Sequence, residues 1–279
     1  MVTKKLNKGL PSMLYGTAWK EDRTPALTLD ALNAGFRGID TANQRKHYFE
    51  EGVGLGIEQF LKASSLSRQD LFLQTKFTFL EGQDKRLPYR ATDSISDQVK
   101  KSFASSLQHL QTDYIDSYLL HGPKYSQGLT TEDWEAWITM EELSKAKHLN
   151  YLGISNVNID QLKTLYENAN VKPKFVQNRC FAERHWDREI REFCQDNSII
   201  YQGFSLLTAN QSYILSPLIF SIATKYHKTI PQIIFSFAKA LAILPLTGTT
   251  NSEHMQDDLS LQDFKLSADE IVQIEQMVG

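Results

Sequence analysis

Short runs of apolar residues recur along the chain and alternate with longer segments of helical periodicity. The runs are rich in Ile, Leu, Val and aromatic residues, have the length of buried strands, and lie at about 12–17, 36–40, 71–76, 115–120, 151–155, 175–179, 199–204 and 241–246. The segments typical of helices lie at Thr24–Ala34, Glu50–Ala63, Ser94–Leu110, Thr131–Lys147, Ile159–Asn168 and Asp187–Asn197. This alternation predicts an α/β fold, a (β/α)8 TIM barrel that forms a single domain over residues 1–279.

Two segments depart from the alternation. Residues 79–92 form a long polar stretch, and residues 208–232 contain an extra helical stretch before the last helix and strand. Loops of this length in a compact domain are commonly functional or mobile. The tail at 267–277 predicts a helix that Ser267 caps, and we expect it to close one end of the barrel.

The composition of the chain limits the kinds of molecule that it is expected to bind. With 279 residues, 41% of them hydrophobic, the chain can bury a sizeable core. A formal net charge of -3 gives no electrostatic basis for binding nucleic acid or an anionic membrane, and no apolar run reaches the roughly 18 residues of a membrane helix. Cys180 and Cys194 lack CxxC spacing, which favours free thiols in a reducing compartment. We therefore expect a cytoplasmic protein with a small-molecule partner; the oligomeric state stays unknown.

Three ionisable side chains stand where a buried strand is predicted to meet solvent. Asp40, Lys76 and His121 each follow an apolar run. Taken singly, they have ordinary explanations as a helix cap, a solvated strand end and a structural histidine. Because barrel enzymes keep their chemistry at the carboxyl ends of the strands, the three together predict a carboxylate, an ammonium and an imidazole on one rim.

Five motifs occur in order at the predicted strand ends. Each alone is weak: GFRGIDTA at 35–42, QTK at 74–76, LLH at 119–121, GISN at 153–156 and GTTNSEH at 248–254. Together they form a series that resembles the aldo-keto reductase family over nearly the whole chain. The resemblance implies reduction of an aldehyde or ketone to an alcohol by hydride transfer from NAD(P)H, with a catalytic tetrad of Asp, Tyr, Lys and His. Asp40, Lys76 and His121 match three members of that tetrad.

The tyrosine of the tetrad requires an insertion. The family usually places it five residues after the Asp, where this chain has Arg45. Residues 50–54 resemble the start of the family's next helix, and counting back from them brings Tyr48 into the tyrosine position. A three-residue insertion within 43–47 explains the offset. The resemblance thus assigns Tyr48 as the general acid.

These residue types fit one reaction. A hydride that reaches a carbonyl carbon builds negative charge on the oxygen, which then needs a proton donor and positive surroundings. A phenol with an ordinary pKa of about 10 is a weak acid, and a neighbouring ammonium lowers that pKa. By resemblance, Tyr48 gives the proton, Lys76 supplies the charge, Asp40 holds Lys76 and His121 orients the carbonyl.

The resemblance also implies a cofactor site. Hydroxyl and amide side chains suit the nicotinamide carboxamide, an aromatic ring stacks on the nicotinamide, and backbone N–H groups at the start of a helix suit phosphate. The implied cofactor-binding residues are Gly16, Thr17, Asp40, Ser155, Asn156, Gln177, Phe204, Ser205, Leu206, Thr247, Gly248, Thr249, Thr250, His254, Asp257 and Asp258. The implied substrate pocket contains Trp19, Tyr48 and His121, and no metal site is implied.

Two positions bear on the choice between NADP and NAD. Many family members hold the 2'-phosphate of NADP with a Lys before the phosphate loop and an Arg in the following helix, and here those positions are Leu246 and His254. A phosphate without a cationic partner loses its charge-assisted bonds. The resemblance therefore predicts NADP, with His254, Thr249 and Thr250 as phosphate partners, and leaves NAD as the alternative.

Two other functions stay open. The family contains catalytically idle barrels that bind NAD(P) and act as redox-sensing or regulatory subunits, and the intact tetrad argues against that alternative. A barrel lyase or isomerase for phosphorylated sugars would keep a phosphate site after the last two strands. It would not need Ser155, Asn156, Gln177 and Phe204 together.

Overall fold

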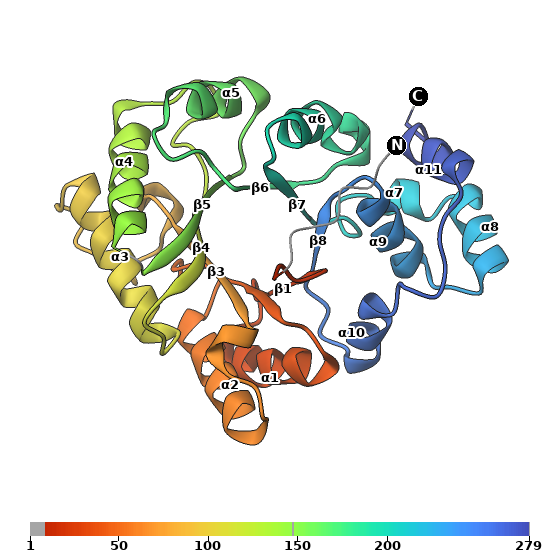
Figure 1. Ribbon diagram of the computed structural model, residues 1–279, viewed down its shortest axis with the longest axis horizontal. Helices are drawn as coiled ribbons and strands as arrows, with labels where there is room; N and C mark the ends of the chain where they lie inside the picture. The colour runs from red at the N-terminus through yellow and green to blue at the C-terminus, as the bar shows by residue number, and fades with distance from the viewer. Residues whose placement is uncertain (1–8, 147, 279) are drawn as a thin grey trace.

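Eight parallel strands close into a barrel in chain order, and helices surround them (Figure 1). The computed structural model describes residues 9–146 and 148–278. The strands are β1 (Leu14–Gly16), β2 (Gly38–Asp40), β3 (Phe72–Phe77), β4 (Ile115–Leu120), β5 (Leu149–Ser155), β6 (Phe175–Arg179), β7 (Ile200–Phe204) and β8 (Leu244–Thr247). Pairing of β1 with both β2 and β8 closes the barrel. The predicted (β/α)8 fold is confirmed.

The helices follow the predicted order. They are α1 (Thr24–Ala34), α2 (Glu50–Ala63), α3 (Ile95–His109), α4 (Thr131–Lys145), α5 (Ile159–Asn168), α6 (Arg188–Asp196), α7 (Gln211–Ile214), α8 (Pro217–Tyr226), α9 (Ile230–Ala240), α10 (Ser252–Leu259) and α11 (Ala268–Glu275), with 3-10 turns η1 (Glu21–Arg23), η2 (Arg68–Asp70), η3 (Leu80–Gly82) and η4 (Ala182–Asp187). Helix α4 ends before Lys147, the predicted end, which lies outside the described residues, as do residues 1–8 and 279 of the predicted domain.

Two predictions near the carboxyl end were wrong. The last strand was expected at 241–246, but Leu241 is the C-cap of α9 and β8 begins at Leu244. The apolar end of a buried helix runs directly into an apolar strand here, so hydrophobicity does not mark the boundary. The tail helix α11 begins after its Ser267 cap as predicted, but it packs against α8 and α9 on the outer ring rather than closing the barrel (Figure 1).

The inside of the barrel is apolar at the amino ends of the strands and polar further along them, toward the carboxyl ends. Leu14, Phe72, Phe175 and Leu244, each the first residue of its strand, form a buried cluster at the amino ends. Side chains alternate between the two faces of a strand, so residues two positions further on return to the interior. On β3, β6 and β7 these residues are Gln74, Gln177 and Gln202, and all three are buried. A polar layer therefore separates the apolar end from the carboxyl ends of the strands.

The long segment after β3 folds back onto the barrel. Tyr89 is buried, and its hydroxyl donates a hydrogen bond to the backbone carbonyl of Thr78 at 2.7 Å. The second predicted irregular segment forms α7 and α8 before α9. Among the described residues no helix is long and apolar enough to cross a membrane.

Candidate active site

A cavity of about 930 Å³ opens at the carboxyl ends of the strands. It is lined by Trp19, Tyr48 and His121 and by every predicted cofactor-binding residue except Thr17. Thr17 differs from the prediction because it is fully buried and its hydroxyl donates to the backbone carbonyl of Asp40 at 3.0 Å. Lys76 does not line the cavity either; it lies buried behind Asp40.

Asp40, the last residue of β2, and Lys76 of β3 form a buried ion pair. The Nζ of Lys76 donates to the two carboxylate oxygens of Asp40 at 2.7 and 2.8 Å and to the carbonyl of Thr41 at 2.8 Å. Their side chains are only 4% and 1% exposed. Burial lowers the pKa of Lys76, and the carboxylate of Asp40 opposes that effect.

Two glutamines connect Asp40 to the polar layer: Gln74, which the sequence reasoning missed, and Gln177, which it assigned to the cofactor site. Gln74 and Gln177 each donate from Nε2 to Oδ1 of Asp40, at 2.7 and 2.9 Å. Both amides also donate to Oε1 of Gln202, at 2.7 and 2.9 Å, and Gln202 donates back to Gln74 at 2.9 Å. One signal in the sequence could have found this polar layer. Each glutamine stands at a strand position whose side chain should point into the barrel interior, where an apolar residue is expected. Side chains of β3 and β6 thus hold the carboxylate directly, and Gln202 of β7 supports the two glutamines.

Tyr48 lies just before α2 and faces the same part of the cavity. Its ring centroid is 6.0 Å from the ring of His121 and 5.5 Å from Nζ of Lys76. Burial and the carboxylate of Asp40 raise the pKa of Tyr48, so the phenol keeps its proton at neutral pH. Arg45, five residues after Asp40, instead pairs with Glu21 at 3.2 Å and does not line the cavity.

His121 follows β4, and its backbone N–H donates to the carbonyl of Phe77 at 2.9 Å. Its Nδ1 lies 2.7 Å from the hydroxyl of Thr78. Burial lowers the pKa of His121 to about 3, with Lys76 and His47 adding to the effect. The imidazole is therefore neutral at physiological pH.

Trp19 and His47 form one wall of the cavity. Their ring centroids are 4.0 Å apart, and the backbone N–H of Trp19 donates to the carbonyl of His47 at 2.7 Å. Trp19 is 69% exposed, so the wall presents an aromatic surface to whatever enters. His47 was not predicted to line the site, because a histidine inside a short charged stretch resembles an ordinary solvated residue.

The hydroxyl and amide side chains at the carboxyl end of β5 already donate hydrogen bonds within the protein. Ser155 donates to the carbonyl of Gln177 at 2.6 Å, and Asn156 donates to the carbonyl of His121 at 2.8 Å. Asn156 and Ser205 have the left-handed backbone values φ 52° and φ 56°. Non-glycine residues adopt this conformation infrequently, and it persists where surrounding structure imposes it.

A buried ammonium at the other end of the cavity was also missed. Nζ of Lys20 donates to the carbonyl of Gly248 at 2.7 Å, and the residue is 4% exposed. Burial lowers the pKa of Lys20 to about 8, and Arg23 contributes. Within the described part of the chain it has no carboxylate partner at ion-pair distance. A buried cation that faces a cavity without such a partner is suited to an anion.

The predicted phosphate site at the start of α10 differs from expectation. The side chain of Asn251 accepts hydrogen bonds from the backbone N–H groups of Glu253 and His254 at 2.8 and 3.3 Å. These N–H groups are therefore already satisfied. Nearby, Asp258 accepts a hydrogen bond from the hydroxyl of Thr247 at 2.8 Å, and burial raises its pKa to about 6.

Comparison with known proteins identifies the family of this chain. The model of the Aldo/keto reductase family matches residues 13–278. This chain belongs to the aldo/keto reductase family. It is 31% identical to the uncharacterized oxidoreductase YtbE and 29% identical to the glyoxal reductase of Bacillus subtilis, in each case over 88% of this chain and 80% of the relative.

Solved structures of aldo/keto reductases have the same fold. An aldo/keto reductase from Brucella melitensis matches with a TM-score of 0.81 and 26% identity, over 98% of both chains. A Bombyx mori aldo-keto reductase, solved in complex with NADP, matches with a TM-score of 0.80 and 24% identity over 98% of this chain and 92% of that one. The protein is thus an oxidoreductase of this family.

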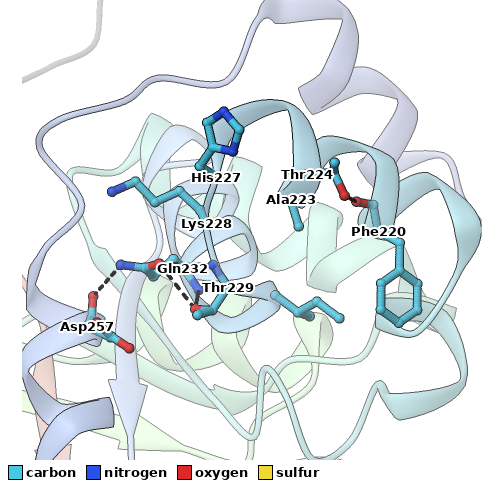
Figure 2. Close-up of a pocket in the computed structure, with 9 residues that line it drawn as sticks. Phe220, Ala223, Thr224, His227, Lys228, Thr229, Gln232 and Asp257 are labelled. Atoms are coloured by element: carbon cyan, nitrogen blue, oxygen red, sulfur yellow. Dashed lines mark hydrogen bonds between the residues drawn. The ribbon is translucent and has the colours of Figure 1, made fainter.

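A second pocket in this aldo/keto reductase, more open to solvent, adjoins the cavity. It is lined partly by Thr229 and Asp257, which also line the cavity, and Figure 2 shows it at the junction of α8 and α9. Gln232 donates to the backbone carbonyl of Asp257 at 3.2 Å across it. The cation there, Lys228, is paired with Asp263 at 2.5 Å. In the described residues no group of three or more His, Cys, Asp or Glu is placed to hold a metal ion.

Two other residues, Trp186 and Cys180, lie in the core. Trp186 is fully buried against the ring of Phe237, and its Nε1 donates to the carbonyl of Ile274 at 3.3 Å. It therefore packs rather than lining a substrate pocket. Cys180 is buried, and burial raises its pKa to about 12, which keeps the thiol unreactive.

Proposed function

We propose that this aldo/keto reductase reduces the carbonyl of an aldehyde or ketone to an alcohol with NADPH, and that Tyr48 is the general acid. The observation that carries the proposal is the buried pair of Asp40 and Lys76 beside a protonated phenol and a neutral imidazole at one cavity. These four groups supply a proton, a positive field and a neutral hydrogen-bonding ring at the place where an oxyanion would form.

The residues at the cavity fit a nicotinamide dinucleotide. Lys20 offers a buried ammonium for a phosphate. Ser155, Asn156 and Gln177 already donate their hydrogens within the protein, so their side-chain oxygens remain as acceptors for the N–H groups of a carboxamide. Phe204 lines the same cavity with an aromatic ring. When bound, the reduced nicotinamide supplies the hydride.

The proposed roles follow from charge and position. Tyr48 keeps its proton until negative charge develops on the carbonyl oxygen, and the ammonium of Lys76 then stabilises the phenolate that is left. Asp40 holds Lys76 in place, and His121, which is neutral, contributes a hydrogen bond without adding charge. Trp19 and His47 limit the shape of the substrate from one side.

The preference for NADP rests on His254, Thr249 and Thr250, which line the cavity near the start of α10. The Bombyx mori relative was solved in complex with NADP. Asp257 and Asp258 line the same region, and a carboxylate suits the free ribose hydroxyl of NAD. NADP is therefore our proposed coenzyme and NAD the alternative that the test must compare.

The test is a fluorescence titration of the protein with NADPH and with NADH, followed by an absorbance screen of aldehydes and ketones that includes glyoxal. We expect tighter binding of NADPH and turnover of at least one carbonyl compound. Binding without turnover of any compound would favour the idle regulatory barrel instead. No binding of either coenzyme would contradict both functions.

We further propose that the enzyme works in the cytoplasm on a small carbonyl compound. Cys180 and Cys194 are both unpaired and buried, which suits a compartment where thiols stay reduced. Fractionation of cells that express the tagged protein would test this, and recovery with a membrane or secreted fraction would contradict it.

A further inference from the structure

Thr78, one residue beyond β3, is the only described hydrogen-bond partner of the His121 imidazole. Its Oγ1 lies 2.7 Å from Nδ1 of His121. Thr78 is 6% exposed, so water does not readily replace this contact. The pair therefore decides which imidazole nitrogen carries the hydrogen.

The direction of this hydrogen bond follows from the donors and acceptors that Thr78 and His121 have available. A neutral imidazole has one N–H and one bare nitrogen. If Nδ1 donated to Thr78, the threonine hydroxyl would be left without an acceptor among the described residues, and a buried unpaired O–H is costly. If the hydroxyl donates to Nδ1 instead, both groups are satisfied. The hydrogen of the imidazole then sits on Nε2.

We propose that Thr78 is a positioning residue that fixes His121 as the Nε2–H tautomer, so that Nε2 donates to the oxygen of the substrate carbonyl. This inference rests on the function proposed above and names a residue outside the tetrad. The pKa of His121, lowered to about 3, keeps the ring neutral throughout. Thr78 thereby sets the donor that meets the oxyanion.

The backbone of Thr78 is held by the long segment after β3. Its carbonyl accepts from the hydroxyl of Tyr89 at 2.7 Å and from Nε2 of Gln83 at 3.4 Å. His121 is held from the other side, because its carbonyl accepts from Asn156 at 2.8 Å. The segment at 79–92 thus acts on the site through the position of Thr78.

The test compares Thr78→Val, which keeps the shape and removes the hydroxyl, with Thr78→Ser, which keeps the hydroxyl. Thr139→Val is the matched control: Thr139 is buried, and its hydroxyl donates to the Glu135 carbonyl at 2.8 Å in α4, away from the cavity. The readouts are kcat, KM, NADPH affinity and the 15N chemical shifts of the imidazoles. His121→Asn identifies the His121 signals among the 7 histidines.

We expect Thr78→Val to lower kcat roughly tenfold or more, as when a hydrogen bond to the reacting oxygen weakens, while NADPH affinity stays unchanged. Its His121 signals should lose the pure Nε2–H pattern of wild type. Thr78→Ser should restore both, and Thr139→Val should lower only the thermal midpoint. A Thr78→Val variant with wild-type kcat and an Nε2–H signal would overturn the proposal.

The 15N measurement distinguishes a failure of this inference from a failure of the proposed function. If the wild-type protein turned over no carbonyl compound, the proposed reduction would fail, but the 15N pattern would still report the tautomer in wild type and in Thr78→Val. A wild-type Nδ1–H signal would overturn the role of Thr78 whatever the activity.

Discussion

The Nζ of Lys76 lies 5.5 Å from the centre of the Tyr48 ring, but its hydrogen bonds go to other residues. An ammonium has three donors, and here they meet the two oxygens of Asp40 and the carbonyl of Thr41 at 2.7 to 2.8 Å. In the proposed reaction, Lys76 would therefore act on Tyr48 through its electric field and not through a hydrogen bond. This predicts that the field depends on Asp40, which both holds the charge and partly neutralises it.

Lys76→Met should lose both turnover and stability, because it removes the charge and leaves Asp40 unpaired in a buried site. Breaking a buried pair from one side typically costs about 3 to 5 kcal/mol. Asp40→Asn keeps the ammonium and should weaken turnover less. The double variant should be more stable than the sum of the single losses. Urea unfolding and single-turnover rates measure both effects.

The matched control is the exposed pair of Lys62 and Glu58, 2.6 Å apart on α2. Lys62→Met should leave the free energy of unfolding nearly unchanged, because solvent screens such a pair. Strictly additive stability losses for Asp40 and Lys76 would show that the two residues do not interact as described.

Tyr48→Phe should lower carbonyl reduction by roughly a hundredfold or more, the usual effect of losing a general acid. NADPH affinity should stay near the wild-type value, because the substitution removes only a hydroxyl. Tyr125→Phe serves as the control, since Tyr125 is 63% exposed and does not line the cavity. Full turnover by Tyr48→Phe would remove Tyr48 from the proposed mechanism.

Lys20 predicts a pH dependence of cofactor binding. Its pKa in the free enzyme is lowered to about 8, so the ammonium is present at neutral pH and is lost as pH rises through that value. NADPH affinity should therefore be steady below neutral pH and fall in the alkaline range. Lys20→Met should weaken binding by roughly tenfold to a hundredfold, as for a lost charge-assisted hydrogen bond, and should flatten the profile.

Lys46→Met is the comparison for Lys20, because Lys46 is an exposed lysine on the loop before Tyr48. It should leave both the affinity and its pH profile unchanged. An alkaline fall in affinity that persists in Lys20→Met would assign the titration to another group.

Glu50 and His109 predict a pH dependence of stability. Nδ1 of His109 lies 2.9 Å from Oε2 of Glu50, which is buried and also accepts from the Thr75 hydroxyl. The hydrogen bond with Glu50 raises the pKa of His109. The folded state thus binds this proton more tightly, so the contribution is complete below the unfolded pKa of about 6.5 and is lost as pH rises through the folded value.

The stability difference between wild type and His109→Gln should accordingly be larger at about pH 5.5 than at about pH 8.5. Urea unfolding at the two pH values measures it. His148→Gln is the control, since Nδ1 of the exposed His148 faces the backbone carbonyl of Asp113 at 2.8 Å. Equal differences for His109→Gln at both pH values would contradict the prediction.

His254→Ala should weaken NADPH binding while leaving NADH binding unchanged, because only NADP carries the 2'-phosphate. His254→Arg should strengthen the preference for NADPH, since a guanidinium binds phosphate in bidentate geometry. Titration of each variant with both coenzymes gives the ratio of dissociation constants. A ratio that neither substitution changes would exclude His254 as the phosphate partner.

The fold was predictable because alternation is a strong signal over the whole chain. The bounds of α1, α2 and α5 agree with those expected from periodicity alone. Boundaries failed where two apolar elements adjoin: nothing in Leu241–Leu246 marks the change from the end of α9 to β8, although Ala242 adopts the left-handed φ 59° that turns the chain.

The site was only partly predictable, for a different reason. Asp40, Lys76 and His121 stand at strand ends, where a polar residue after an apolar run is noticeable. Lys20 and Thr78 are ordinary polar residues in loops, and only the folded chain brings Lys20 to Gly248, 228 positions away. Their roles depend on long-range contacts that no local pattern encodes.

The amide layer beneath the site also bears on how this enzyme can change over evolution. Asp40 accepts hydrogen bonds from Gln74 and Gln177, and both glutamines also donate to Gln202. One substitution in this network therefore leaves buried donors or acceptors unpaired on several strands at once. Variation that alters substrate range should therefore accumulate in the Trp19 and His47 wall, where a side chain can change without that penalty. A library randomised at the wall should yield many folded variants with new selectivity, whereas one randomised at the glutamines should yield few folded proteins.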